Sequence, residues 1–152
     1  ELDVITLRPF NNYGPRQNKA ALAAVIPITI NRILQGLSPI LEGDGTQTRD
    51  FIYVEDTVKI IRKFIEFNPK AHREFNIGTG EEISILKLVN NICEIMNYKG
   101  EFIKKAKRKA DVARHSANID RLVSEIGDLN LTSLSAGLER TVNWYQEKFQ
   151  AD

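Results

Sequence analysis

The 152-residue sequence has little of several features that mark specialised classes of protein. It has one cysteine, Cys93, so no disulfide forms within the chain, and we expect a reducing, cytoplasmic setting. Its 21 Lys and Arg residues against 20 Asp and Glu residues leave a formal charge of +1, which provides no broad basic field for nucleic acid. The longest apolar stretch, Ala20 to Ile30, is broken by Pro27 and Thr29 and is shorter than the roughly 20 residues of a membrane span. We therefore expect neither a nucleic-acid nor a membrane partner.

Residue patterns for metal binding and for hydrolytic catalysis are also missing. His72 and His115, the two histidines, are far apart in sequence, and neither has a Cys or carboxylate at the spacing of metal ligands. A Gly-x-Ser-x-Gly motif around a nucleophilic serine is absent. We therefore predict no metal site and expect both histidines to be surface or loop residues.

What is present is the composition of one globular domain, with 42% apolar and 27% charged residues. A chain of this length buries roughly 68–70% of its unfolded surface, so its core needs neither disulfides nor metal. Short β-branched runs alternate with segments in which apolar residues recur at helical spacing, which predicts an α/β fold. The predicted strands are 4–7, 40–41, 51–54 and 75–77, and the predicted helices are 22–37, a helix after Asp56, 84–97, 119–126 and 134–149.

Four expectations about single elements follow from these patterns. Strand 4–7 is a short run of β-branched and apolar residues and should be buried. Cys93 lies on the apolar face of helix 84–97, where burial would make it a poor nucleophile. Asp56 is placed to cap the helix that follows it. The predicted core face of that helix consists of Val58, Ile61, Phe64 and Ile65.

The segment Gly78-Thr79-Gly80 follows a predicted strand and precedes a predicted helix, as a dinucleotide phosphate loop does. However, Ile83 stands where such a loop has its third glycine. Glu81 and Glu82 put negative charge where a pyrophosphate needs bare N–H groups. We therefore favour a simple strand-to-helix turn over a phosphate loop.

Two basic features suggest a phosphorylated ligand. The run from Lys104 to Lys109 is typical of a solvated loop and has no nucleic-acid recognition motif beside it, but one of its residues could bind a small phosphate compound. Arg49 lies in a Gly-rich loop before a predicted strand. A guanidinium grips a diphosphate through two parallel hydrogen bonds, so two arginines from separate loops suit such a ligand. The alternative for Arg49 is a surface ion pair with Asp50, worth about 0–1 kcal/mol.

Several motifs follow one another along nearly the whole chain. They are Leu-Arg-Pro-Phe-Asn-Asn-Tyr-Gly-Pro-Arg-Gln at 7–17, Val-Ile-Pro at 25–27, Gly-Asp-Gly-Thr-Gln-Thr-Arg-Asp-Phe-Ile-Tyr-Val-Glu-Asp at 43–56, Phe-Asn-Ile-Gly at 75–78, and Gly-Leu to Trp-Tyr at 137–145. Each motif alone is weak, but the combination is specific. It resembles the C-terminal half of extended short-chain dehydrogenase/reductase enzymes that act on nucleotide sugars, such as UDP-glucose 4-epimerase and dTDP-glucose 4,6-dehydratase.

This resemblance implies a fold and a set of binding residues. The chain would be a single truncated unit, the C-terminal part of an extended Rossmann-type fold, with strands of the cofactor fold near 3–8 and 74–78. Mixed helices and short strands would form the substrate-binding subdomain, and Phe10 would border the nicotinamide end of NAD. The implied substrate-binding residues are Asn11, Arg49 and Arg108 at the diphosphate, Asp111 at the ribose hydroxyls, and Ala24, Val25, Ile40, Leu41 and Glu42 at the nucleotide and its base.

The sequence departs from the family pattern in two ways. Glu42 stands where a stacking side chain is common, Ala24 replaces a frequent polar residue, and Ala110 precedes Asp111 where Gly is usual; these departures concern the base more than the diphosphate. The catalytic Tyr-x-x-x-Lys pair and the Gly-rich NAD loop of the family are both absent from the sequence. No catalytic residue is therefore expected in this chain.

The resemblance implies the nucleotide-sugar-binding portion of an NAD-dependent epimerase or dehydratase, with its catalytic residues upstream of Glu1. UDP-glucose 4-epimerase-like chemistry through a 4-keto intermediate stands slightly ahead of 4,6-dehydration. The expected partners are a nucleotide-diphosphate sugar and further copies of the chain in a homodimer or other homo-oligomer, since an unpaired strand edge invites association. The alternative from another class is a non-catalytic nucleotide-diphosphate-binding or structural module.

Overall fold

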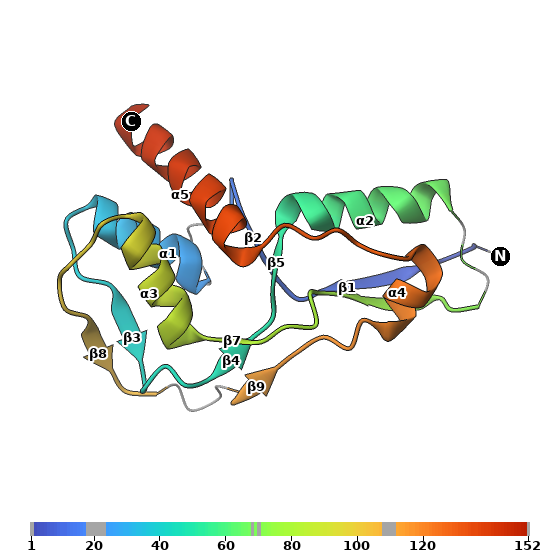
Figure 1. Ribbon diagram of the computed structural model, residues 1–152, viewed down its shortest axis with the longest axis horizontal. Helices are drawn as coiled ribbons and strands as arrows, with labels where there is room; N and C mark the ends of the chain where they lie inside the picture. Colours follow the sequence, from blue (N-terminus) through green and yellow to red (C-terminus); the bar gives the residue numbers. More distant parts are fainter. Residues whose placement is uncertain (1, 18–23, 68, 70, 108–111, 152) are drawn as a thin grey trace.

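The computed structural model describes residues 2–17, 24–67, 69, 71–107 and 112–151 (Figure 1). Helices and short strands alternate along these ranges. The helices are α1 (Val25–Leu34), α2 (Val54–Glu66), α3 (Ile85–Ile95), α4 (Asp120–Ile126) and α5 (Leu134–Ala151). The strands are β1 (Thr6–Pro9), β2 (Asn11–Tyr13), β3 (Ile40–Glu42), β4 (Thr48–Arg49), β5 (Phe51–Tyr53), β6 (Glu74–Ile77), β7 (Ile83–Ser84), β8 (Ile103–Lys105) and β9 (Arg114–His115).

The strands form small sheets in which parallel pairing dominates. β1 pairs with β6, β2 with β5 and β3 with β8, all in parallel. A three-stranded sheet has the order β7-β4-β9, in which β4 is antiparallel to β7 and parallel to β9. Parallel pairs require long crossover connections, and here helices supply them. The predicted α/β fold is thus confirmed.

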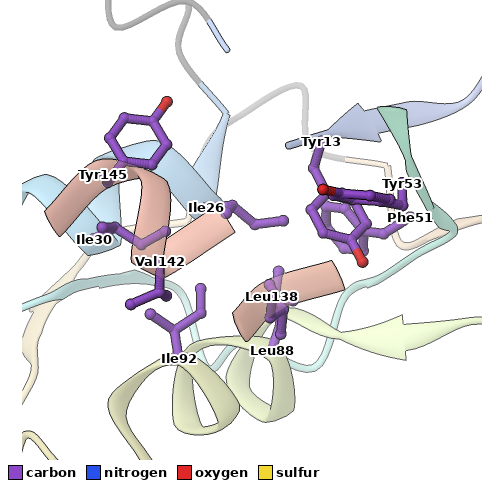
Figure 2. Packing of buried hydrophobic residues seen from close by; sticks show 10 residues of the cluster. All are labelled: Tyr13, Ile26, Ile30, Phe51, Tyr53, Leu88, Ile92, Leu138, Val142 and Tyr145. Carbon is purple, nitrogen blue, oxygen red and sulfur yellow. The ribbon is translucent and has the colours of Figure 1, made fainter. Parts of the chain in front are cut away.

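Two apolar clusters hold these elements together. In the first, Figure 2 shows Leu138 and Val142 of α5 facing Leu88 and Ile92 of α3, and α1 lies against both helices. The second packs α2 and α4 against β6, at the other end of the molecule in Figure 1. Its buried members are Ile52, Ile60, Phe64, Phe75, Ile77 and Leu122. Strand β5 lies between the two clusters, since Phe51 and Tyr53 belong to the first and Ile52 belongs to the second.

Most predicted elements are present with shifted ends. Gly36 follows α1 with φ +71°, as expected of a residue that ends a helix, and Ser84 caps α3 by accepting a hydrogen bond from Lys87 N (3.2 Å). Cys93 is buried on α3, which confirms its predicted position, and burial raises the pKa of its thiol, which disfavours the reactive thiolate. Within the described ranges, no helix is both long enough and apolar enough to cross a membrane.

The predictions for α2 were largely wrong. The helix begins directly after β5, at Val54, so Asp56 lies inside it and does not cap it. The Asp56 carboxylate is buried and accepts hydrogen bonds from Thr132 N (2.7 Å), Thr132 Oγ1 (3.1 Å) and Lys59 Nζ (2.9 Å). The buried face of α2 consists of Asp56, Thr57, Ile60 and Phe64, which differs from the predicted face. Phe64 is therefore the one residue of the predicted core face that is buried, whereas Val58, Ile61 and Ile65 are exposed.

Strand β1 also differs from its prediction. It spans Thr6–Pro9, two residues later than predicted, and its side chains are largely exposed. Among the described residues its pairing partner is β6, which covers one edge, and the second apolar cluster covers Leu7 from one face. The apolar run at 4–7 is therefore not buried within these residues, and Val4 is exposed.

The first apolar cluster should carry much of the stability of the fold. Leu138 is fully buried, so Leu138→Ala should lower the free energy of unfolding by about 2–5 kcal/mol, through lost transfer energy and the cavity that remains. The control is Ile65→Ala on α2, where the side chain is 80% exposed and the change should be within about 0.5 kcal/mol. Urea unfolding measures both, and equal losses would contradict this packing.

Candidate functional site

Asp50 is a buried carboxylate at the junction of β4 and β5. Its side chain has no exposed surface and accepts four hydrogen bonds. The donors are Thr79 N (2.9 Å), Thr79 Oγ1 (2.7 Å), Gly80 N (2.9 Å) and Ala117 N (3.2 Å). Burial of a charge is costly unless hydrogen bonds replace its hydration, and these donors supply that replacement. Asp50 therefore fixes two segments remote in sequence against the β4–β5 junction.

The Gly78-Thr79-Gly80 turn is shaped by this carboxylate. A Cβ on Gly78 would lie 2.7 Å from Asp50 Oδ2 and 2.5 Å from Ala117 Cβ, so a side chain has no room there. Gly80 has φ +77°, a conformation that L side chains rarely adopt. The N–H groups that a phosphate loop would offer to a ligand thus bind Asp50, which excludes the phosphate-loop alternative.

The main chain of Asp50 places Asn11. Its carbonyl oxygen accepts hydrogen bonds from Asn11 N (3.2 Å) and from Asn11 Nδ2 (2.7 Å). Asn11 begins β2, which pairs in parallel with β5, and the preceding Phe10 donates its N–H to Ile77 O (2.8 Å) at the end of β6. Phe10 and Asn11 therefore lie where β1 passes into β2, beside the Asp50 junction.

Arg49 and His115 reach the same junction through the pairing of β4 with β9. Asp50 N donates to His115 O (3.0 Å), and the β4–β9 pairing sets Arg49 opposite His115. The His115 ring stacks on the Phe10 ring, with centroids 4.6 Å apart and an interplanar angle of 23°. Phe10, Asn11, Arg49 and His115 thus gather around Asp50, although they come from three separate stretches of sequence.

A surface ion pair between Arg49 and Asp50 was one of the alternatives for these residues, and it is wrong. The Asp50 carboxylate has no exposed surface, and its printed hydrogen bonds come from Thr79, Gly80 and Ala117, so it is not part of a surface ion pair. Arg49 is half-buried, and its Nη1 donates to Thr48 O (2.6 Å).

The other predicted ligand residues lie on different elements. Ala24 is the N-cap residue of α1, whose carbonyl accepts from Ile28 N (3.3 Å), and Val25 is the first residue of that helix. Ile40, Leu41 and Glu42 form β3, in which Leu41 is buried. Arg108 and Asp111 lie outside the described residues. Among the predicted site residues, the structure therefore brings Phe10, Asn11 and Arg49 together.

Sequence reasoning missed Asp50 as an organising residue and assigned His115 no contact. The available signal for Asp50 was a carboxylate placed immediately before the buried run Phe51–Tyr53, where an unpaired charge would be costly. Nothing in the spacing of His115 indicated a stack on Phe10, because that contact depends on the pairing of β4 with β9. Within the described ranges, no group of three or more His, Cys, Asp or Glu side chains is arranged to hold a metal ion.

An ion pair fastens the three-stranded sheet next to the site. Glu82, just before β7, accepts hydrogen bonds from both Arg114 Nε (3.2 Å) and Arg114 Nη2 of β9, and from Thr48 Oγ1 (2.7 Å) of β4. The Arg114 guanidinium and the Thr48 hydroxyl hold the pKa of Glu82 below its ordinary value of 4.5. The pair therefore joins β9 and β4 to the segment that enters β7, in the same sheet in which Arg49 pairs with His115.

Comparison with known proteins gives consistent results. A profile of the NAD dependent epimerase/dehydratase family matches residues 1–78. The chain is 38% identical over 143 residues to a putative UDP-glucose 4-epimerase of Methanocaldococcus jannaschii (94% of this chain, 46% of that protein). It is 33% identical over 147 residues to a dTDP-glucose 4,6-dehydratase of Streptomyces griseus (96% of this chain, 44% of that protein).

A solved structure, the UDP-glucose 4-epimerase of Thermotoga maritima with UDP-glucose, matches with a TM-score of 0.83 and 32% identity. It covers 93% of this chain, which corresponds to 45% of that protein. The chain spans about half the length of these relatives and aligns with the C-terminal half of a Rossmann-type fold.

The Glu82–Arg114 ion pair predicts a pH dependence of stability. Because the folded-state pKa of Glu82 is lowered, its stabilisation is fully present above the ordinary pKa of 4.5 and is lost as the pH falls through the folded-state value. The Tm difference between the wild type and Glu82→Gln should be constant above about pH 5.5 and shrink below about pH 4.5. Glu81→Gln, an exposed neighbour, controls for the loss of one negative charge. A difference that persists unchanged at pH 3 would contradict the role of this pair.

Proposed function

The chain belongs to the NAD-dependent epimerase/dehydratase family, and from this membership we propose that it is the nucleotide-sugar-binding portion of an enzyme that acts on an NDP-sugar. The observation that carries the proposal is the gathering of Phe10, Asn11 and Arg49 around Asp50, which brings an aromatic residue, an amide and an arginine to one junction of the fold. These groups suit a ligand with a diphosphate next to a ring that undergoes redox chemistry.

Asn11 and Arg49 have the chemistry for the diphosphate. One N–H of the Asn11 amide binds Asp50 O, which orients the amide and leaves its second N–H to donate to a phosphate oxygen. Arg49 adds a planar set of N–H donors and a positive charge. We assign the same role to Arg108, which would give two guanidinium groups for about two negative charges.

The nucleoside end is proposed to lie against other elements. Ala24 and Val25 at the start of α1 would line the nucleotide site, and the main chain of β3, from Ile40 to Glu42, would hold the edge of the base. Asp111 would accept hydrogen bonds from the ribose hydroxyls, since a carboxylate is an acceptor without donors.

The family uses NAD, and among the described residues we propose a contact with it at Phe10 only. The Gly78–Gly80 turn has its N–H groups bound to Asp50 and offers no cradle for a pyrophosphate. Phe10 would border the nicotinamide end, and its ring is held in place by the stack with His115. When bound, NAD would accept and return hydride at C4 of the sugar; this chain would position and orient the sugar nucleotide.

Within this class we place a UDP-glucose 4-epimerase-like enzyme first and an NDP-glucose 4,6-dehydratase second. The printed names of the Methanocaldococcus jannaschii and Thermotoga maritima relatives support the first, and that of the Streptomyces griseus relative supports the second. The product distinguishes them, because 4-epimerisation conserves the mass of the sugar nucleotide and dehydration lowers it by one water. A homodimer or other homo-oligomer is also proposed, supported by the exposed side chains and single described pairing of β1.

Titration calorimetry with UDP and dTDP tests the diphosphate site. We expect UDP to bind and Arg49→Ala to weaken the affinity by about tenfold or more, because a charged, directional contact is lost. The matched control is Arg62→Ala on α2, an exposed arginine paired with Glu66, which should leave the affinity unchanged.

Affinity, nucleotide preference and product analysis together separate the proposed function from its alternatives. Binding that survives Arg49→Ala unchanged would overturn the assignment of this residue. Preference for dTDP over UDP would favour the dehydratase. If the protein, expressed with whatever its gene encodes on either side of these residues, binds a sugar nucleotide but yields neither epimer nor dehydrated sugar, the non-catalytic module is the better description.

A further inference from the structure

We infer that Asp50 is a positioning residue for the ligand site, which its buried carboxylate assembles without touching the ligand. The inference rests on the proposed function for the identity of the ligand. Three stretches of chain meet at Asp50: Phe10–Asn11 through its carbonyl oxygen, Thr79–Gly80 through its carboxylate, and His115–Ala117 through both its N–H and its carboxylate.

The geometry makes these contacts interdependent. The carboxylate fixes the side chain of Asp50, and thereby the orientation of the two peptide groups on either side of it. One of these peptide groups accepts from Asn11, and the other donates to His115. His115 in turn stacks on Phe10, which closes a ring of contacts around the β4–β5 junction. Loss of the carboxylate would therefore move the aromatic pair and the Asn11 amide together.

A carboxylate is required because every group that faces it is a donor. Its two oxygens offer about four acceptor positions, which matches the three main-chain N–H groups and the Thr79 hydroxyl. The amide of an asparagine would present its own N–H groups to some of these donors. Asp50→Asn therefore keeps the size of the side chain but breaks the set of hydrogen bonds.

The chain contains a matched control at Asp56. Its carboxylate is also buried and also accepts from the main-chain N–H and the hydroxyl of one threonine, Thr132. It binds α2 to the segment that precedes α5, and none of its described hydrogen-bond partners is one of the four residues gathered around Asp50. Asp50 and Asp56 are thus alike in burial and in their threonine donors, but Asp56 also pairs with Lys59 Nζ (2.9 Å), and the two carboxylates differ in what they hold.

The experiment compares Asp50→Asn with Asp56→Asn in the 152-residue chain, with UDP as the probe. Both variants should lower the Tm. Asp50→Asn should weaken UDP binding to the folded protein by about tenfold or more, and Asp56→Asn by less than about twofold. In NMR spectra without ligand, the Asn11 Nδ2 and His115 ring signals should shift in Asp50→Asn and stay in place in Asp56→Asn.

A milder pair of variants covers the case in which Asp50→Asn does not fold. Thr79→Val removes one hydrogen bond to Asp50 (2.7 Å), Thr132→Val removes one to Asp56 (3.1 Å), and Thr79→Ser keeps the hydroxyl. Thr79→Val should shift the Asn11 and His115 signals, Thr79→Ser should restore them, and Thr132→Val should leave them unchanged.

Unchanged Asn11 and His115 signals in Asp50→Asn or Thr79→Val, or equal shifts in the Asp56 set, would overturn the positioning role. If the wild-type chain does not bind UDP, the proposed diphosphate site fails, while the NMR comparison still decides whether Asp50 positions these residues.

Discussion

The structure depends on one buried negative charge. Asp50 lies where β4 passes into β5, has no exposed surface, and is held by four donors from two distant segments. An uncompensated carboxylate in such a place would cost several kcal/mol, so these segments must be present for the fold to be stable. The end of β6 and the end of β9 are therefore fixed to the same point, and the residues with ligand chemistry lie around it.

The same buried charge explains the role of the Gly78-Thr79-Gly80 turn. A Gly-x-Gly turn has two uses in α/β proteins. A Gly-x-Gly turn after a strand exposes main-chain N–H groups, which attract an anion. In a dinucleotide site that anion is an external phosphate. Here it is the chain's own Asp50, and Gly78 has no room for a side chain because the carboxylate and Ala117 approach so closely. The turn thus holds the scaffold in place and leaves phosphate recognition to Asn11 and Arg49 in the proposed function.

Local patterns in the sequence predicted most of the elements, because apolar spacing and turn residues report on helices and strands directly. They did not predict which face of α2 is buried, since that depends on Thr132, 76 residues after Asp56, which satisfies the carboxylate. They also did not predict that Asp50 turns inward or that His115 stacks on Phe10. Both depend on strand pairing between distant segments, which one sequence does not encode in any local signal. Phe10 and Asn11 were predicted through the family motifs, and Arg49 also from the chemistry of a guanidinium in a Gly-rich loop; their ligand contacts stay predictions.

Amide hydrogen exchange at Thr79, Gly80 and Ala117 tests the central role of Asp50 most directly. None of these residues lies in a helix or strand, so without the carboxylate their N–H groups would exchange at rates close to those of an unfolded chain. If Asp50 holds them, all three amides should be protected to a similar degree, close to that of β6. Exchange at unstructured rates, or widely different protection among the three, would contradict the conclusion that one buried carboxylate assembles this site.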